Sequence, residues 1–237
     1  MLHPIDPDRA HLVGFAVSWH GRLMTLAWGV LAPLAILAAR FFKVVPGQDW
    51  PRELDNQLWW RLHWMGQSIV LLTTALGIGL VLSIAGSLGV HGVLGYTVLL
   101  LVAAQVGMGL LRGTKGGPTA PAHDGSLRGD HYDMTRWRQL FEAAHKGMGY
   151  ALLLVAVATI LLGMWEANAP RWMWVLLAVW WVALLIAATW LQRAGRAIDT
   201  YQAIWGPSPE HPGNRRPAPG WAMRRINEQG AADVRRD

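Results

Sequence analysis

The sequence predicts an all-α membrane protein with five transmembrane helices, the first four of which form an up-down-up-down bundle. Its 237 residues are 53% hydrophobic and 15% charged, whereas a soluble domain carries about a quarter charged residues. The apolar residues come in long runs. Many of the 15 tryptophans stand at the ends of those runs, which is where the aromatic belts of membrane proteins lie.

Five apolar runs are long enough to cross a bilayer, which takes about 20 residues in a helix. We expect helices over 12–42, 59–85, 89–111, 140–165 and 171–193. Residues 1–11 lack the basic start of a signal peptide, so the first run is expected to be retained as a span. The spans define a membrane domain over 1–195, followed by a basic Pro/Gly-rich cytoplasmic tail over 196–237. We expect the tail from residue 206 onward to be disordered or partner-bound, and 112–137 to be a long cytoplasmic loop.

The basic residues predict how the spans are oriented, because cytoplasmic segments are enriched in Lys and Arg. If the helices alternate in direction, 18 of the 21 basic residues fall on one side: Arg40, Lys43, Arg52, Arg61, Arg112, Lys115, Arg128, Arg136, Arg138, Lys146, Arg193, Arg196, Arg215, Arg216, Arg224, Arg225, Arg235 and Arg236. The N-terminus is therefore predicted to be periplasmic and the C-terminus cytoplasmic. The excess of Arg over Lys favours a GC-rich bacterial source, and hence the bacterial inner (cell) membrane. The net charge of +6 then reflects topology, so the expected partner is the lipid bilayer and not nucleic acid.

Four histidines lie inside the apolar runs, each towards the N-terminal end of its run: His20, His63, His91 and His145. An ionisable residue in a membrane helix is costly and marks a functional site by default. Because the helices alternate in direction, His20 and His91 share the outer level, and His63 and His145 share the inner level. In an up-down-up-down bundle each pair sits on diagonal helices. Each pair can therefore grip a flat cofactor in the core.

Haem suits these pairs better than a bare metal ion does. Zn²⁺ wants four ligands, whereas haem iron lacks only its two axial ones. The chain has no cysteine, which excludes Fe–S clusters, disulfides and covalently attached c-type haem. Small residues that give a planar group room lie near the histidines: Gly21, Gly66, Gly92, Gly95 and Gly149. Iron with both axial positions filled favours electron transfer over oxygen chemistry.

Other polar residues are weaker candidates. Arg22 and Arg40 are predicted to bind the cofactor through its propionates, with snorkelling to lipid headgroups as the alternative. The remaining histidines are expected to be solvated or interfacial: His3, His11, His123, His131 and His211. Asp130, His131 and Asp133 could form a small cytoplasmic site, but a solvated turn or a partner contact is favoured. A membrane histidine can also simply bond a neighbouring carbonyl in a packed interface.

Several motifs resemble the cytochrome b561 family, especially the membrane part of its DOMON-fused members and their bacterial relatives. They are His20-Gly21, Trp28-Gly29, Pro33 and residues 39–43 in the first span, His91-Gly92 with Gly95 and Gln105 in the third, and His145 with Gly147 and Gly149 in the fourth. The resemblance covers residues 12–193. It implies two non-covalent b haems held by four histidines, with His20 paired to His91 and His63 to His145. It also implies electron transfer across the membrane.

The predicted function is thus transmembrane electron transfer between a donor at one face and an acceptor at the other. Ferric, ascorbate-linked and quinone-linked reductase activities are open alternatives for the reaction. So is a haem-bearing anchor subunit that exchanges electrons with quinone for a larger complex. A third hypothesis is a haem-free metal or proton transporter that uses the histidines as relay sites. The expected partners are a small-molecule or protein donor and acceptor, and a homodimer or larger redox complex is left open.

Overall fold

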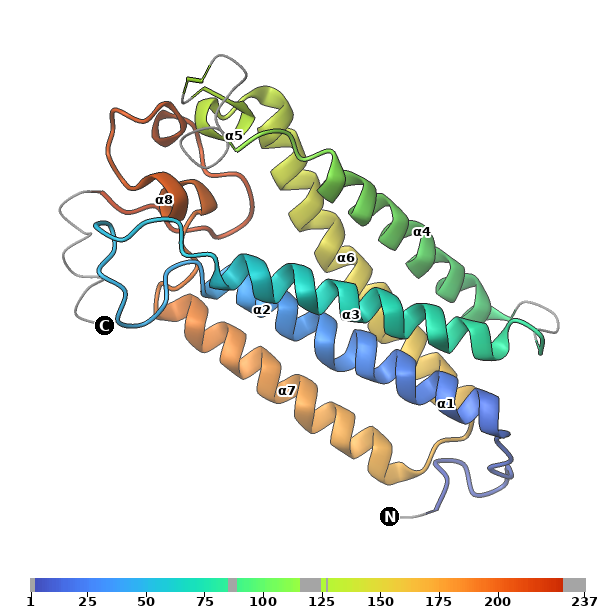
Figure 1. The fold of residues 1–237 in the computed structure, drawn as a ribbon. Helices are drawn as coiled ribbons and strands as arrows, with labels where there is room; N and C mark the ends of the chain where they lie inside the picture. The colour runs from blue at the N-terminus through green and yellow to red at the C-terminus, as the bar shows by residue number, and fades with distance from the viewer. Residues whose placement is uncertain (1–2, 85–88, 116–124, 127, 228–237) are drawn as a thin grey trace. The chain divides into compact units, whose positions relative to one another are not determined.

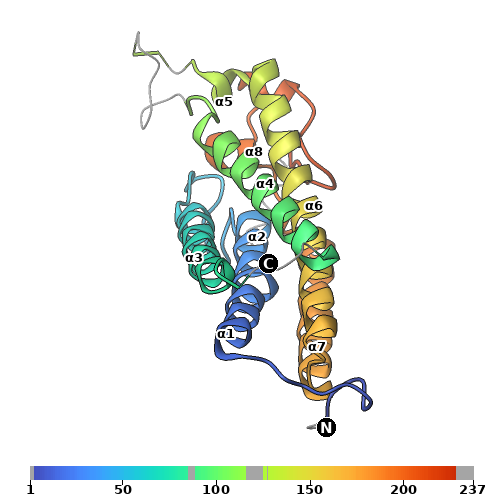
Figure 2. The same ribbon diagram turned by 90° about the vertical axis from the view of Figure 1, so that its right-hand side faces the viewer.

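A computed structural model describes residues 3–84, 89–115, 125–126 and 128–227. The predictions for His123 and for the end of the tail, 228–237, lie outside these residues. Within them the regular secondary structure is helical, and the only extended pairing consists of two isolated bridges. Figure 1 shows the order of the elements and Figure 2 shows them turned by 90°.

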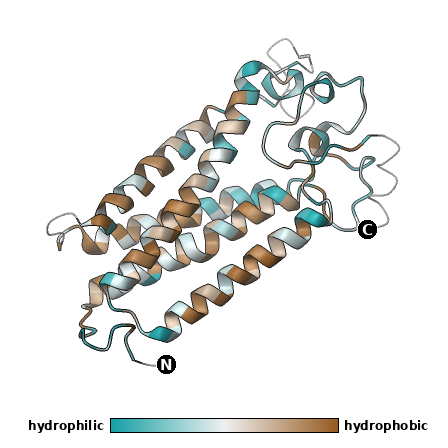
Figure 3. Cartoon of the chain, turned by 180° about the vertical axis from the view of Figure 1, so that it is seen from behind, coloured by the Kyte–Doolittle hydropathy of each residue, from teal (hydrophilic) through white to brown (hydrophobic). Residues whose placement is uncertain are grey.

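Five helices are long and apolar enough to cross a membrane, as predicted. The first span joins α1 (Phe15–Met24), a π-helical stretch (Thr25–Leu31) and α2 (Ala32–Phe41). The others are α3 (Leu58–Val81), α4 (Val90–Leu110), α6 (Arg136–Glu166) and α7 (Arg171–Arg193). Apolar colour runs along these helices and polar colour gathers at their ends (Figure 3). The predicted ends of the spans differ from the observed ends by a few residues. For example, α6 begins at Arg136, four residues before the predicted start.

The π-helical stretch of the first span follows from Pro33. Proline has no N–H, so it cannot bond to the carbonyl four residues back, which is that of Gly29. This buried oxygen accepts hydrogen bonds from the indole N–H groups of Trp180 (3.0 Å) and Trp181 (3.1 Å) of α7 instead. Two tryptophans thus satisfy a backbone acceptor that the proline leaves open.

The chain divides into two compact units, each built from three separate segments. Unit 1 comprises Met1–Leu37, Leu62–Val102 and Ala151–Trp190. Its core brings together apolar residues of all five spans: Ala27, Trp28, Ala32, Val70, Val98, Leu152, Ala156, Ile160, Met164, Ala169 and Leu177. These spans pack through small and branched side chains, which lets their backbones approach closely.

Unit 2 comprises Ala38–Arg61, Ala103–Tyr150 and Leu191–Asp237. It contains the short helices α5 (Asp130–Asp133) and α8 (Thr200–Trp205) and a 3-10 turn (Pro212–Arg215). Its small apolar core joins Val44 and Trp50 to residues of the C-terminal segment: Ile198, Ala203 and Ile226. The expectation of disorder is therefore wrong for 206–227, because Ile226 is buried in this core; that this segment binds a partner stays a prediction. The division at residue 195 stays a prediction.

Candidate functional site

Two of the four predicted histidines meet inside unit 1. The ring centroids of His20 in α1 and His91 in α4 are 6.2 Å apart, and the ring planes are nearly perpendicular at 86°. Two imidazole nitrogens that share a metal each lie about 2 Å from it, so with the ring radii added the centroids come to about 6 Å apart. The observed separation fits one metal atom between the rings. A T-shaped contact between two rings has a similar spacing. The hydrogen bonds of the ring nitrogens are therefore stronger evidence for a metal-binding pair than the spacing is.

Three of the four histidines bond a backbone carbonyl of another helix through Nδ1. The distances are 2.9 Å from His20 to Gly77, 3.0 Å from His91 to Thr159, and 3.2 Å from His63 to Ala35. A carbonyl oxygen can only accept, so Nδ1 carries the proton and Nε2 keeps its lone pair. Metal-binding histidines commonly donate their second N–H to a carbonyl in this way. For His20 and His91 this bond is the one that a histidine makes when it binds a metal through Nε2.

Glycines bring the helices close enough for these bonds. A Cβ at Gly163 would lie 2.8 Å from Cε1 of His91, and a Cβ at Gly66 would lie 2.9 Å from that of Ala35. At Gly77 a Cβ would overlap the Met24 methyl group. Gly77 and Gly163 were missed by the sequence analysis, because they lie far along the chain from the histidines they accommodate. The only sequence feature that could have indicated them is a glycine inside a helix with no turn or cap nearby to explain it.

His145 lies on α6 in unit 2, whereas His63 belongs to unit 1. The His145 ring stacks on Phe141, with centroids 5.4 Å apart and an interplanar angle of 25°. Its backbone oxygen accepts a 2.9 Å hydrogen bond from Nε2 of Gln105 on α4. Gly149 lets the same glutamine approach, since a Cβ there would lie 3.4 Å from its Nε2.

The two predicted arginines have protein partners. The Arg22 guanidinium lies 5.1 Å from the Trp19 ring centroid, a cation–π contact at the surface. Arg40 donates to the Tyr150 hydroxyl (2.8 Å), to Oε1 of Gln192 (2.8 Å) and to the backbone oxygen of Trp221 (3.1 Å). Their predicted role with propionates stays a prediction.

A buried charge cluster in unit 2 surrounds Glu142 on α6. Its carboxylate accepts from Nε of Arg138 (2.9 Å) and from Nζ of Lys146 (2.8 Å). Nε2 of His131 lies 3.5 Å from Oε1 of Glu142, and Nδ1 of His131 accepts a hydrogen bond from the indole N–H of Trp205 (3.2 Å). Burial, and then the nearby Arg138, lower the pKa of His131 to about 3, so the ring is neutral at pH 7.

The prediction that His131 is solvated or interfacial is wrong. Only 1% of it is exposed, and its ring packs against Tyr201 as well as Trp205. The residues that cover it come from α8, some 70 positions along the chain, and no local pattern announces them. His131 ties the 128–134 turn to the C-terminal segment.

Lys43, just beyond α2, is a second buried cation of unit 2. Its ammonium donates to the backbone oxygen of Ile198 at 2.9 Å. Burial lowers its pKa to about 7, and the charge of Lys146 acts in the same direction.

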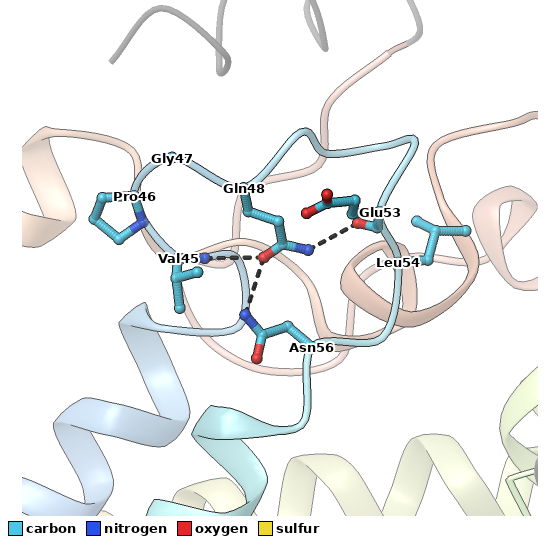
Figure 4. A pocket seen from close by; sticks show the side chains of 7 residues that line it. All are labelled: Val45, Pro46, Gly47, Gln48, Glu53, Leu54 and Asn56. Carbon is cyan, nitrogen blue, oxygen red and sulfur yellow. Dashed lines mark hydrogen bonds between the residues drawn. The ribbon is translucent and has the colours of Figure 1, made fainter.

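A shallow open pocket lies in the connection between α2 and α3 (Figure 4). Gln48 organises it, since its amide accepts from the backbone N–H of Val45 and from Asn56 and donates to the backbone oxygen of Glu53. None of the predicted site residues lines this pocket. Among the residues that the structure describes, no group of three or more His, Cys, Asp or Glu side chains is placed to hold a bare metal ion.

The fold and the histidines define a multi-pass membrane protein with imidazoles presented between helices. No family model matches the chain, and no solved structure matches it. Curated relatives do: ferric-chelate reductase 1 of Bos taurus is 31% identical over 61% of this chain and 22% of its own length. A cytochrome b561, DM13 and DOMON domain-containing protein of Arabidopsis thaliana is 31% identical over 61% of this chain and 14% of its own. Ferric-chelate reductase 1 of Homo sapiens is 29% identical over 61% and 22%.

Over about three fifths of its length, the chain is thus similar to proteins named ferric-chelate reductase 1 and cytochrome b561, DM13 and DOMON domain-containing protein. It spans less than a quarter of the length of these relatives, since the matched part covers 22% of the bovine protein and 14% of the plant one.

Proposed function

We propose that this protein transfers electrons across a membrane through two b-type haems, each held by two histidines. The observation that carries the proposal is the pair His20 and His91, whose ring centroids lie 6.2 Å apart and whose Nδ1 atoms both bond backbone carbonyls. The relatives named cytochrome b561 and ferric-chelate reductase support the same chemistry. Bound haem supplies an iron that takes up and gives back single electrons.

The residues of this chain hold and orient that group. His20 and His91 are the proposed ligands of one haem. The carbonyls of Gly77 and Thr159 fix the tautomer and direction of those rings.

The second proposed pair is His63 with His145. Support comes from the order and direction of the spans, and from the bond between Nδ1 of His63 and the Ala35 carbonyl, which orients the ring. We further propose that the N-terminus faces the periplasm and the C-terminus the cytoplasm of a bacterial inner membrane. This assignment rests on the Lys and Arg distribution alone, and the curated relatives are eukaryotic.

The names of the relatives suggest a ferric chelate as the electron acceptor. The donor, and any homodimer or larger redox complex, are not specified by this chain's residues. Reconstitution into vesicles that contain a reductant separates the alternatives. Reduction of an external ferric chelate supports a stand-alone reductase. Reaction with a quinol, without transfer to the chelate, supports the anchor-subunit hypothesis instead.

Haem content tests the proposal directly. The purified protein should show a Soret band and contain two haems b per chain by pyridine haemochrome assay. His20→Ala and His91→Ala should each remove one haem, whereas His11→Ala should keep both, because His11 is exposed and bonds only the Ala167 carbonyl. A folded but colourless protein contradicts the proposal and leaves the haem-free transporter. Equal loss of both haems contradicts two separate sites.

A further inference from the structure

The backbone of segment 219–222 is hydrogen-bonded to side chains of three membrane-length helices within unit 2. Nη2 of Arg40 in α2 donates to the backbone oxygen of Trp221 at 3.1 Å, and Nε2 of Gln192 in α7 donates to that of Ala222 at 3.0 Å. Nζ of Lys146 in α6 donates to that of Pro219 at 2.8 Å. All three donors lie within helices that can cross the membrane. Arg40 and Gln192 stand next to the last residues of α2 and α7, whereas Lys146 lies further inside α6. The segment therefore lies level with the ends of α2 and α7.

The backbone conformation of the 219–222 turn is fixed by close contacts with its neighbours. Gly220 has a φ of +108°, and a Cβ there would lie 2.9 Å from Cδ of Lys146. Ala222 also has a positive φ, of 52°. Glycine adopts a positive φ readily, whereas for Ala222 such a φ is costly and persists where surrounding contacts fix it. The three hydrogen bonds above are such contacts.

Trp221 presents its side chain outward from this turn. It is 83% exposed, more than the next tryptophan, Trp190, at 67%. Its backbone oxygen is held by Arg40, so the backbone is fixed while the indole is not packed on the protein. Tryptophan is enriched at the membrane–water boundary, where its ring meets apolar chains and its N–H meets water. An indole at the end of the spans is suited to that boundary.

The surrounding segment is strongly basic. Residues 211–227 contain no Asp or Glu. Arg225 is paired with Asp199, whereas Arg215, Arg216 and Arg224 are exposed and make no ion pair with a described carboxylate. Clustered arginines close to a membrane surface attract anionic headgroups. A guanidinium also forms a bidentate pair with phosphate.

We propose that residues 211–227 form a membrane-surface layer. Trp221 inserts among the headgroups, and Arg215, Arg216 and Arg224 bind anionic phospholipid. A protein partner is the competing occupant, but the position of Trp221 at the ends of the spans favours lipid. The proposal does not depend on haem, so its tests use the folded protein in a bilayer and not its activity.

Depth at position 221 is the first test. The chain has no cysteine, so Trp221→Cys can be spin-labelled selectively, and the backbone bond from Arg40 is unaffected. In phosphatidylcholine nanodiscs with phosphatidylglycerol, the label should collide more with O₂ than with a water-soluble nickel chelate. A label at Glu210→Cys, an exposed position of the same unit, should show the opposite preference. Equal access of the nickel chelate to both positions overturns the proposal and leaves a protein as occupant.

Gly220→Ala tests whether the pinned turn sets that depth. The added methyl group meets Lys146 and strains the backbone, so the label at 221 should become accessible to the nickel chelate. Gly107→Ala is the control, because a Cβ there meets nothing within 4 Å. Circular dichroism and size-exclusion chromatography establish that each variant remains folded. An unchanged label depth in a folded Gly220→Ala variant contradicts the role of the turn.

Lipid retention tests the arginines. Native mass spectrometry of protein released from mixed nanodiscs should show bound phosphatidylglycerol. Combined Arg215→Gln, Arg216→Gln and Arg224→Gln should reduce it several-fold, while Arg52→Gln with Arg128→Gln, two exposed arginines elsewhere in unit 2, should not. Equal retention by the triple variant and the unaltered protein overturns headgroup binding.

Discussion

The two units of this protein satisfy their buried polar groups in different ways. In unit 1 the described buried polar residues are uncharged, namely Thr73, Thr74 and Asn168, and its histidines bond backbone carbonyls. In unit 2 the described buried polar residues include four charged side chains: Lys43, Arg138, Glu142 and Asp199. One unit relies on helix backbones, and the other on side-chain charges.

This difference predicts different sensitivities. A carbonyl oxygen is present whatever the side chain, so the bonds of unit 1 depend on how closely the helices approach, and thus on glycines. A buried charge loses its compensation when one partner is removed. Unit 2 should therefore respond to charge deletion and to pH, and unit 1 to added bulk.

Glu142→Gln should have the largest effect on stability. The change leaves the buried Arg138 and the half-buried Lys146 without their carboxylate, and breaking a buried pair costs about 3–5 kcal/mol. Asp49→Asn is the matched control, because its pair with Arg52 is exposed and such pairs are worth about 0–1 kcal/mol. Thermal unfolding in one detergent compares the two. Similar losses would show that the cluster does not stabilise unit 2.

Acid should destabilise unit 2 through His131, whose pKa of about 3 lies below its ordinary value of 6.5. As the pH falls below about 6.5, the unfolded chain binds a proton that the folded chain does not. Stability should then decline by on the order of 1 kcal/mol per pH unit until about pH 3. His131→Gln should flatten the curve of melting temperature against pH, whereas His11→Gln should not. Parallel curves for His131→Gln and the unaltered protein would contradict the assignment.

The two units also differ in how well their structure could be predicted from the sequence. Span number followed from long apolar runs, and the five helices are confirmed because hydrophobic length is a local signal. The pairing of His20 with His91 at one level followed from helix direction, and the structure brings these two rings together. Their role as ligands stays a prediction.

Unit 2 was harder to predict because its contacts join distant short segments. The Pro- and Gly-rich composition of 206–227 indicated disorder. Yet the side-chain amide of Gln202 donates to the backbone oxygen of Ile226 and accepts from its backbone N–H. His131 is buried by Trp205, which has no periodic relation to it. Pattern and composition report on helices and faces, whereas burial of a loop depends on partners that no local signal specifies.

Gly163→Ala should loosen the His91 position with a smaller cost to stability. The new methyl group would lie 2.8 Å from Cε1 of the ring, and overpacking of this kind costs about 1–3 kcal/mol. Displacing the bond to Thr159 should also weaken haem binding about 10- to 100-fold, measured by haem titration. Gly79→Ala adds the same group where nothing lies within 4 Å. Equal haem affinity in both variants would remove Gly163 from the site.

The smallest effect on stability should come from removing one of the two indole groups that donate to the backbone oxygen of Gly29. Trp180→Phe removes one of two indole donors, and Trp181 still satisfies the oxygen, so the loss should be about 1 kcal/mol or less. Trp180→Phe with Trp181→Phe leaves that carbonyl without an indole, because Pro33 supplies no N–H, and an unsatisfied buried acceptor costs about 1–3 kcal/mol. The double variant should thus lose more than the two single variants together, as measured by a double-mutant cycle. Strict additivity would show that the two indoles act independently, and that the carbonyl freed by Pro33 is not what couples α7 to the first span.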